Sequence, residues 1–295
     1  MWTEDRKAEL ARELIARIRA LSAPRRPVPA PVAARGGRLP GIRAVFFDVY
    51  NTMLACAFDE TRADGRAFAQ ACAALGFAAS PAAAPRHAKL FRGAIEAEHR
   101  ESRGRGIAFP EVDIRAVWRD VLARLHAEGL FPRRPDEDDI ARLAIEYECR
   151  VDPAWPVPGL ADLLEDLAGR GIKLGIVSNA QFYTPLVLEA FLGDSRARRC
   201  FDPVLCVWSY RLKEAKPSPR LASAALDALR TEYGIAPEEA VMVGNSPEKD
   251  ILPAAALGCA AVLCTADAGP EALEPEACAK AAAVIGDLRD LAAIL

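Results

Sequence analysis

The stretch AVFFDVYNTML, residues 44–54, decides the fold of this chain. It begins with apolar residues that do not alternate with polar ones, which is typical of a strand covered on both faces. Asp48 follows directly where this apolar run ends. Because open parallel sheets bind ligands at the carboxyl ends of their strands, we expect Asp48 to be a catalytic carboxylate. The alternative is that Asp48 only begins a turn, since aspartate is frequent where strands end.

The composition is that of an ordinary globular protein. The chain has 295 residues, 52% of them hydrophobic and 27% charged, which suffices for one large domain or two. With a formal net charge of −3 it lacks the basic surface that binds nucleic acid or an anionic membrane. The charged start of the chain and the lack of any apolar run of membrane-spanning length lead us to expect a cytoplasmic protein.

The cysteines and histidines do not indicate a metal site. The eight cysteines form no CxxC pair, and several lie inside apolar runs, so we expect buried free thiols in a reducing cytosol. His87, His99 and His126 lie far apart and lack the spacing of zinc ligands. The sequence therefore predicts no zinc site.

A helix and a linker precede the first strand. Residues 3–21 carry apolar side chains at helical spacing, and the segment that follows up to residue 40 is rich in proline. Thr3 is the expected N-cap of the helix. We expect the apolar face of the helix to pack on the rest of the chain or to form a homodimer contact, with no functional role in either case.

The region after the first strand is helical. Segments near 61–75, 81–101, 113–128 and 136–149 have apolar residues at intervals of three and four, and none of them reads as a strand. Three prolines at 153, 156 and 158 mark the end of this region. The sequence thus predicts three parts: a leader over residues 1–40, an α/β core over 41–58 and 154–295, and a helical cap domain over 59–153. We expect the cap to lie over the strand ends and to close on a substrate.

From Gly159 onwards, helical and strand patterns alternate. Strands are predicted over 172–177, 203–208, 240–243 and 260–264, and helices over 159–169, 183–193, 217–233, 248–257 and 287–294. Strands that alternate with helices of this length predict a doubly wound parallel sheet with right-handed crossovers. The predicted fold is therefore α/β, with an inserted helical domain.

Polar residues stand at the ends of four of the predicted strands, and in a parallel sheet these ends converge on one edge. They are Asp48 with Thr52, Ser178 with Asn179, Lys216, and Asn245 with Ser246 and Asp250. Together they suggest nucleophilic catalysis by a carboxylate: Asp48 attacks, Ser178 and Asn179 hold an anionic group, and Lys216 offsets charge. Asp250 would orient water, a metal or the lysine. Singly, each residue has a structural alternative as a helix cap, a first-turn acid or a solvated side chain.

These residues resemble the haloacid dehalogenase superfamily of hydrolases. The resemblance rests on DVYNT (48–52), VSN (177–179), the Lys216-Pro217 step and GNSPEKD (244–250), which occur in the order of that family. It covers about 41–58 and 157–290, and the helical insert stands where the family has its cap domain. The resemblance implies a Rossmann-like core, a covalent intermediate on Asp48 and a small anionic substrate. It does not cover the leader of residues 1–40.

Most members of this family are magnesium-dependent phosphatases, and for them the resemblance implies that Mg²⁺ is held by Asp48, the Tyr50 carbonyl, Asp250 and Asn245. Thr52, Ser178 and Lys216 would surround the phosphoryl oxygens. Two positions depart from the phosphatase pattern. Tyr50 replaces an aspartate that serves as general acid and base, and Asn245 replaces an aspartate ligand by a neutral amide.

The resemblance also implies an alternative, since Tyr at position 50 is typical of 2-haloacid dehalogenases, whose halide leaving group needs no proton and whose reaction needs no metal. That pattern is incomplete too, because Ala222 and Pro247 stand where those enzymes have Tyr and Asn. Arg92 is the nearest match to their halide-binding arginine, with Arg86 as a rival. Tyr50, Asn179, Arg92, Asn245 and Ser246 are the predicted substrate-binding residues. We predict a phosphate monoester phosphatase, with a carbon-halogen hydrolase or a catalytically weakened binding protein as alternatives.

Overall fold

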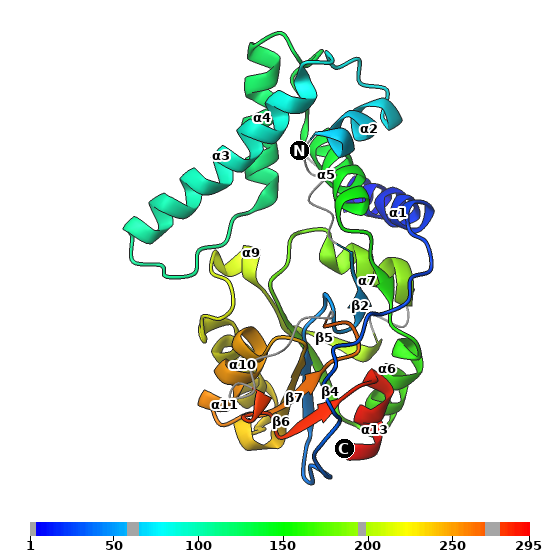
Figure 1. The fold of residues 1–295 in the computed structure, drawn as a ribbon, viewed down its shortest axis with the longest axis vertical. Coiled ribbons are helices and arrows are strands. Elements are labelled where there is room, and N and C mark those ends of the chain that lie inside the picture. The colour runs from blue at the N-terminus through cyan, green and yellow to red at the C-terminus, as the bar shows by residue number, and fades with distance from the viewer. Residues whose placement is uncertain (1–3, 58–64, 194–198, 269–277) are drawn as a thin grey trace. The chain divides into compact units, whose positions relative to one another are not determined.

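The computed structural model describes residues 4–57, 65–193, 199–268 and 278–295 (Figure 1). Their contacts divide the chain into two compact units. The helical unit comprises Met1–Ala23, Ala57–Ala154 and Gln181–Phe191, and the α/β unit comprises Pro24–Cys56, Trp155–Ala180 and Leu192–Leu295. No helix in the described part of the chain is both long and apolar enough to cross a membrane.

The α/β unit is built on a six-stranded sheet whose paired strands are all parallel, in the order β5-β4-β1-β6-β7-β8. The strands are β1 (Ala44–Phe47), β4 (Lys173–Ser178), β5 (Phe201–Trp208), β6 (Ala240–Gly244), β7 (Ala260–Cys264) and β8 (Ala283–Ile285). In the middle of the sheet, Phe47 at the end of β1 lies opposite Ile176 of β4 and Val243 of β6. All four residues of β1 are buried, as their unbroken apolar pattern predicts.

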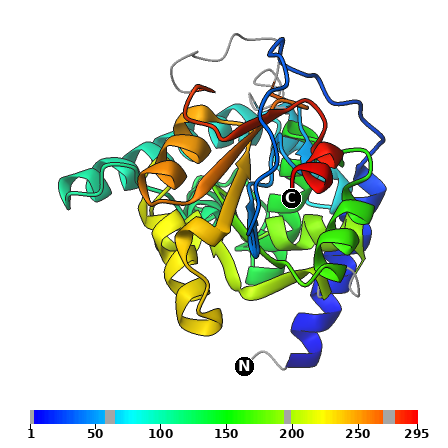
Figure 2. The same cartoon turned by 90° about the horizontal axis from the view of Figure 1, so that it is seen from below.

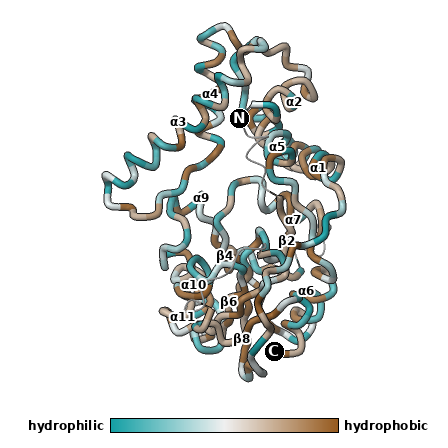
Figure 3. Tube along the Cα trace, viewed as in Figure 1, coloured by the Kyte–Doolittle hydropathy of each residue, from teal (hydrophilic) through white to brown (hydrophobic). Residues whose placement is uncertain are grey.

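Helices cover both faces of this sheet. Figure 1 shows α10 (Arg220–Tyr233) and α11 (Leu252–Ala256) on one face and α6 (Leu160–Gly169) and α13 (Leu291–Ile294) on the other. Each helix buries an apolar stripe; in α6 the stripe is Leu160, Leu163, Leu164 and Leu167. Hydrophobic residues are concentrated in the strands between these helices (Figure 3). The prediction of a doubly wound parallel sheet is confirmed.

Some elements differ from the sequence prediction. Strand β8 has only three residues and was not predicted, since so short an apolar segment has no readable period. The helix predicted over 248–257 begins with a π-helical turn, Pro247–Ile251, before α11. Two short antiparallel strands, β2 (Leu54–Ala55) and β3 (Trp155–Pro156), pair where the chain enters and leaves the helical insert. A short helix, α9 (Ser209–Leu212), follows β5.

The linker of residues 24–43 passes the edge of the sheet at β8, where Arg35 lies beside Val284, before it enters β1 (Figure 2). Arg35 and Val284 exchange two backbone hydrogen bonds of 3.0 and 2.7 Å in an antiparallel bridge. Nearer the helix, buried Asp267 accepts hydrogen bonds from the backbone amides of Val28 (2.7 Å) and Cys56 (2.9 Å). This carboxylate therefore ties the linker to the segment that leaves β2.

The helical unit contains α1 (Glu4–Leu21), α2 (Arg66–Ala74), α3 (Ala83–Gly104), α4 (Ile114–Ala127), α5 (Glu137–Val151) and α7 (Thr184–Leu192). These correspond to the helices that the periodicity predicts, although Thr3 and residues 58–64 lie outside the described part. Helix α5 begins with a capping box in which Asp136 accepts from the Asp139 amide and Asp139 accepts from the Asp136 amide. The prediction that the insert lies over the strand ends of the sheet stays a prediction.

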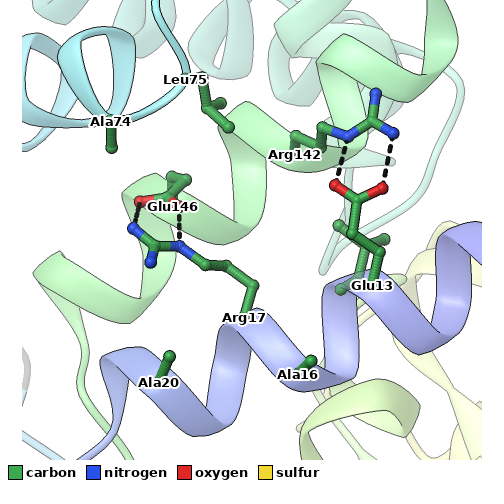
Figure 4. A pocket seen from close by; sticks show the side chains of 9 residues that line it. Glu13, Ala16, Arg17, Ala20, Ala74, Leu75, Arg142 and Glu146 are labelled. Carbon is green, nitrogen blue, oxygen red and sulfur yellow. Dashed lines mark hydrogen bonds and ion pairs between the residues drawn. The ribbon is translucent and has the colours of Figure 1, made fainter.

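Helix α1 packs on α5 within this unit. Leu14, Ile15 and Ile18 are buried, as the apolar face of α1 predicts. Charged pairs flank this contact: Arg6 with Asp138 (3.0 Å), Arg142 with Glu13 (2.7 Å) and Arg17 with Glu146. Figure 4 shows the last two pairs on either side of the space between the helices. Of the two placements considered for this helix, packing on the chain itself is observed, and a homodimer stays a prediction.

Candidate active site

Asp48 stands at the carboxyl end of the central strand. Its backbone amide donates to the carbonyl of Val243 on β6 at 2.9 Å, which extends the pairing of β1 by one residue. The chain then turns tightly: Asn51 has a φ of 60°, and its amide donates to the Leu54 carbonyl at 2.7 Å. Asparagine tolerates this left-handed conformation better than most residues do. The strand and the turn together fix the Asp48 side chain, which is only 6% exposed.

Lys216 joins two carboxylates of the site. Its Nζ donates to Asp48 Oδ1 and to Asp250 Oδ1, both at 2.6 Å, and to the Val177 carbonyl at 3.1 Å. All three donor positions of the ammonium group are therefore satisfied. The three side chains come from positions far apart in the sequence and are all buried. The structure thus brings together the charged residues that the parallel-sheet argument predicted.

Two hydroxyl groups complete the surroundings of the nucleophile candidate. Ser178 Oγ donates to Asp48 Oδ1 at 3.0 Å, so this oxygen accepts from both a hydroxyl and an ammonium group. Thr52 is fully buried, and its Oγ1 lies 3.5 Å from Asn245 Oδ1. Asp48 Oδ2 accepts a hydrogen bond from no residue in the part of the chain that the structure describes. One oxygen of Asp48 is therefore held while the other remains available for reaction.

Asp250 is positioned by the end of β6. Its Oδ2 accepts from the Ser246 amide at 3.0 Å, and Ser246 Oγ accepts from the Lys249 amide at 3.2 Å as the N-cap of the turn. Gly244 permits this arrangement, since a Cβ at this position would lie 2.3 Å from both Cγ and Oδ2 of Asp250. The glycine before Asn245 is therefore a requirement of the site geometry.

Asn179 holds the backbone of Lys216. Its Oδ1 accepts from the Lys216 amide at 2.7 Å, and its Nδ2 donates to the Lys216 carbonyl at 3.1 Å. The peptide bond between Lys216 and Pro217 is cis. Both polar atoms of the asparagine are thus engaged in positioning the lysine, a role that its place at a strand end did not reveal. Its predicted role in substrate binding stays a prediction.

The charges of the site are coupled. Burial opposes the charged form of Lys216, but the carboxylates of Asp250 and Asp48 outweigh burial and raise the lysine pKa. Burial also raises the pKa of Asp250, against the effect of Lys216, which lowers it. We therefore treat the lysine as charged at neutral pH. A second cation would further stabilise Asp48 and Asp250, the two carboxylates that share Lys216.

The donor atoms near Asp48 fit a hard divalent cation. Asp48 Oδ2, the backbone carbonyl of Tyr50, Asn245 Oδ1 and the Asp250 carboxylate are all oxygens, which Mg²⁺ prefers. The free Oδ2 of Asp48 and the long contact of Asn245 Oδ1 with Thr52 leave these oxygens able to accept a ligand bond. No cluster of three or more carboxylate, histidine or cysteine side chains suited to a metal occurs among the described residues. A cation here would thus depend on carbonyl, amide and water oxygens as well as on carboxylates.

The predicted arginines belong to the helical unit and not to the α/β unit. Arg86 forms an ion pair with Glu128, at 2.6 Å for its shortest contact. Arg92 is exposed on α3 and makes no hydrogen bond or ion pair with another residue in the described ranges. Their assignment to substrate or halide stays a prediction. The roles of the Val177 carbonyl and of Gly244 were not predicted from the sequence, because backbone acceptors and close approaches leave no side-chain signal.

Comparisons with known proteins agree with this geometry. A family model described as haloacid dehalogenase-like hydrolase matches residues 42–258. The phosphoserine phosphatase of Thermus thermophilus is 35% identical over 152 residues, which cover 51% of this chain and 56% of that protein. The phosphoglycolate phosphatase of Rhodospirillum rubrum is 34% identical over 148 residues, which cover 47% of this chain and 56% of that protein. The match thus spans little more than half the length of each relative.

A solved structure shows the same fold. The crystal structure of a HAD phosphatase from Thermococcus onnurineus superposes with a TM-score of 0.50 at 21% identity, over 86% of this chain and 97% of that chain. The family model covers most of the chain and contains every residue of the Asp48, Ser178, Lys216 and Asp250 constellation. The chain therefore belongs to the haloacid dehalogenase-like hydrolases.

Proposed function

We propose that this hydrolase cleaves phosphate monoesters of small molecules through a covalent intermediate on Asp48. The observation that carries the proposal is the unequal state of the two Asp48 oxygens. Oδ1 is held by Lys216 and Ser178, whereas Oδ2 accepts from no described residue. A carboxylate fixed in this way at a strand end is suited to nucleophilic attack, since it loses little freedom when it reacts.

The proposed reaction has two steps. Asp48 Oδ2 attacks phosphorus, so that a bond from phosphorus to Asp48 forms and the bond to the leaving alcohol breaks. Water then hydrolyses the aspartyl phosphate, which releases inorganic phosphate and restores Asp48. Lys216 offsets negative charge, and the hydroxyls of Ser178 and Thr52 would turn from their present acceptors to donate to phosphoryl oxygens. Mg²⁺ bound by the oxygens of Asp48, Tyr50, Asn245 and Asp250 would supply charge stabilisation of the phosphoryl group.

The phosphatase assignment is supported by the relatives. Both curated matches at 34–35% identity are named as phosphatases of small phosphorylated acids, phosphoserine and phosphoglycolate. A phosphoryl group also brings more negative charge than Lys216 offsets, and the oxygen donors around Asp48 are of the kind that holds a divalent cation. We propose a small anionic phosphate ester as the substrate.

Tyr50 favours a second candidate, the hydrolysis of a carbon-halogen bond in a 2-haloacid. A halide leaves without a proton, so this reaction has no need of a carboxylic acid two residues after the nucleophile. It also needs no divalent cation, because Lys216 balances the charge of the site. In this case an ester between Asp48 and the substrate carbon replaces the aspartyl phosphate.

A hydrolysis screen separates the two candidates. Phosphate monoesters and 2-haloacids are each incubated with the full chain, once with Mg²⁺ and once with a chelator. The proposal predicts phosphate release that depends on Mg²⁺ and no halide release. Halide release that persists in chelator would replace the proposed function by the second candidate, and no turnover of either class would favour a binding protein.

A further inference from the structure

The helical unit contains a pocket of its own, between α3, α4, α5 and the residue before α7. It has a volume of about 260 Å³. Four aromatic side chains are among its lining residues: Phe91, Trp118, Tyr147 and Tyr183. Two charged side chains, Glu148 and Arg92, also line it. A pocket with apolar walls and few polar groups is the usual form of a small-molecule site.

The aromatic rings form a continuous wall. The ring centroids of Phe91, Trp118 and Tyr147 lie 5.3 to 5.7 Å from one another, so the three rings are in mutual contact. All three of these side chains border the pocket. The face of an aromatic ring attracts a cation, most strongly in the case of tryptophan, when the cation lies within about 6 Å.

Glu148 gives the pocket a carboxyl group that has no positively charged partner among the described residues. Tyr183 donates a hydrogen bond to its carboxylate, and no lysine or arginine in the described ranges forms an ion pair with it. Burial raises the pKa of Glu148 to about 7, and the negative charge of Asp152 adds to this effect. A carboxylate in this position is stabilised by a cation that enters the pocket.

The neighbouring charged groups do not supply that cation. His87 packs against Trp118 and Tyr147, and burial lowers its pKa to about 3, so it is neutral at physiological pH. Arg92 carries a positive charge, but its side chain is exposed at the rim and is not paired with Glu148. The interior of the pocket is therefore aromatic and acidic.

Another cavity of the helical unit lacks such an unpaired carboxylate. This space, about 440 Å³, lies between α1 and α5 and is also lined by two carboxylates, Glu13 and Glu146 (Figure 4). Both are engaged, Glu13 with Arg142 and Glu146 with Arg17. In the described structure, that cavity offers a ligand no carboxylate without a partner. The pocket lined by Glu148 and the aromatic wall, called the Glu148 pocket below, does.

We propose that the Glu148 pocket binds a small organic ammonium ion. The ammonium group lies against the aromatic wall and forms an ion pair with the Glu148 carboxylate. The volume of the pocket is enough for a head group of the size of choline, and not for a large ligand. This inference concerns the helical unit alone, and it does not depend on the reaction proposed at Asp48.

The test compares choline with 3,3-dimethylbutan-1-ol, which has the same shape without the charge. Both are titrated into the full chain by calorimetry. We expect choline to bind about tenfold more tightly or better, from the combined cation–π and carboxylate interactions. Equal binding of the two probes, or binding of neither, would overturn the proposal.

Three variants locate the binding. Glu148→Gln keeps the size of the side chain and should abolish the preference for choline, whereas Glu96→Gln, at an exposed position on α3 outside the pocket, should leave it unchanged. Arg92→Ala removes a like charge from the rim and should strengthen choline binding. If Glu148→Gln retains the preference while its circular dichroism and melting temperature match the parent, the site is not this pocket. Weaker choline binding in Arg92→Ala would contradict the proposed position of the cation, since loss of a like charge near it cannot weaken an ion pair with Glu148.

A last variant keeps this inference separate from the proposed function. Asp48→Asn removes the nucleophile candidate in the α/β unit and should bind choline as the parent does. Choline binding by a protein that hydrolyses no phosphate ester would therefore leave the pocket assignment standing while the phosphatase proposal fails.

Discussion

Tyr50 determines which leaving groups the proposed reaction can expel. It stands two positions after Asp48, where a phosphatase of this family has a carboxylic acid that protonates the leaving group. Without that acid, the departing alcohol must leave with its negative charge, so the rate should depend strongly on leaving-group acidity. Aryl phosphates should therefore react much faster than alkyl phosphates.

The Tyr50→Asp variant tests this dependence. We expect kcat/KM for alkyl phosphates to rise by about 10²–10⁴-fold, the usual contribution of a positioned general acid, with a much smaller change for aryl phosphates. Tyr50→Phe is the control and should not produce the gain. A Tyr50→Asp variant that is no better on alkyl phosphates would mean that another group already protonates the leaving alcohol.

Asn245 determines how the site holds a cation. Its amide oxygen is a neutral donor where most of the family's phosphatases have a carboxylate, and a hard cation prefers the charged ligand. In a phosphatase, Asn245→Asp should tighten Mg²⁺ binding by about tenfold and raise activity at low Mg²⁺. Turnover titrated with Mg²⁺ from chelated to saturating conditions measures both effects.

The same change should harm a haloacid dehalogenase. There an added carboxylate would compete for Lys216 and repel the anionic substrate. A metal-independent parent that loses activity in Asn245→Asp would therefore contradict the phosphatase proposal and favour the second candidate.

The end of strand β6 must leave room for the Asp250 side chain, which lies directly against the backbone of Gly244. An alanine at position 244 would place its Cβ 2.3 Å from the Asp250 carboxylate, so the acid must move away from Lys216. We expect Gly244→Ala to lower kcat by about 10²-fold, since a displacement of about 1 Å can cost that much. Gly169→Ala on α6, where nothing lies within 4 Å, is the matched control. Full activity in Gly244→Ala would mean that Asp250 is not needed in its observed position.

His87 on helix α3 should make the stability of the fold depend on pH. This side chain is fully buried, stacks on Phe68 with 4.0 Å between ring centroids, and has no hydrogen-bond partner for either ring nitrogen in the described structure. Burial lowers its pKa from 6.5 to about 3. Below about pH 6.5 the unfolded chain therefore binds a proton that the folded chain does not, and stability falls as pH decreases towards 3.

The His87→Phe variant should remove this loss. The free energy of unfolding of the parent should fall by about 1.4 kcal/mol per pH unit between about pH 6 and pH 4 from this group alone, and the variant should lack that component. Denaturant titrations followed by circular dichroism at several pH values measure the slope. His126→Gln, at an exposed position, is the control. An unchanged slope in His87→Phe would show that the imidazole is protonated in the folded state.

In the molecule as a whole, local patterns predicted the elements, and the parallel-sheet rule predicted which polar residues lie together. The unbroken apolar run before Asp48 identified the central strand, and the polar residues after the other strands identified Ser178, Lys216 and Asp250. All of these lie together in the structure. The prediction succeeded because strand order in a parallel sheet brings distant residues to one edge without any further information.

Contacts between distant helices could not be predicted in this way. Arg142 pairs with Glu13 across 129 residues, and the aromatic wall of the Glu148 pocket combines residues of α3, α4 and α5. Helical periodicity shows which face of a helix is buried, but not which helix covers it. The roles of Asn179 and Gly244 were missed for a related reason, since both act on backbone or carboxylate positions that only the folded chain defines.

Mass spectrometry of the quenched enzyme shows most directly whether Asp48 forms a covalent intermediate. The full chain is mixed with its best phosphate ester in the presence of Mg²⁺, quenched in acid within one turnover and digested. We expect one added phosphoryl group on the peptide that contains Asp48. In folded Asp48→Asn we expect this group to be absent and turnover to fall by several orders of magnitude. Turnover by the parent with the phosphoryl group on another residue, or undiminished turnover in Asp48→Asn, would contradict a covalent intermediate on Asp48.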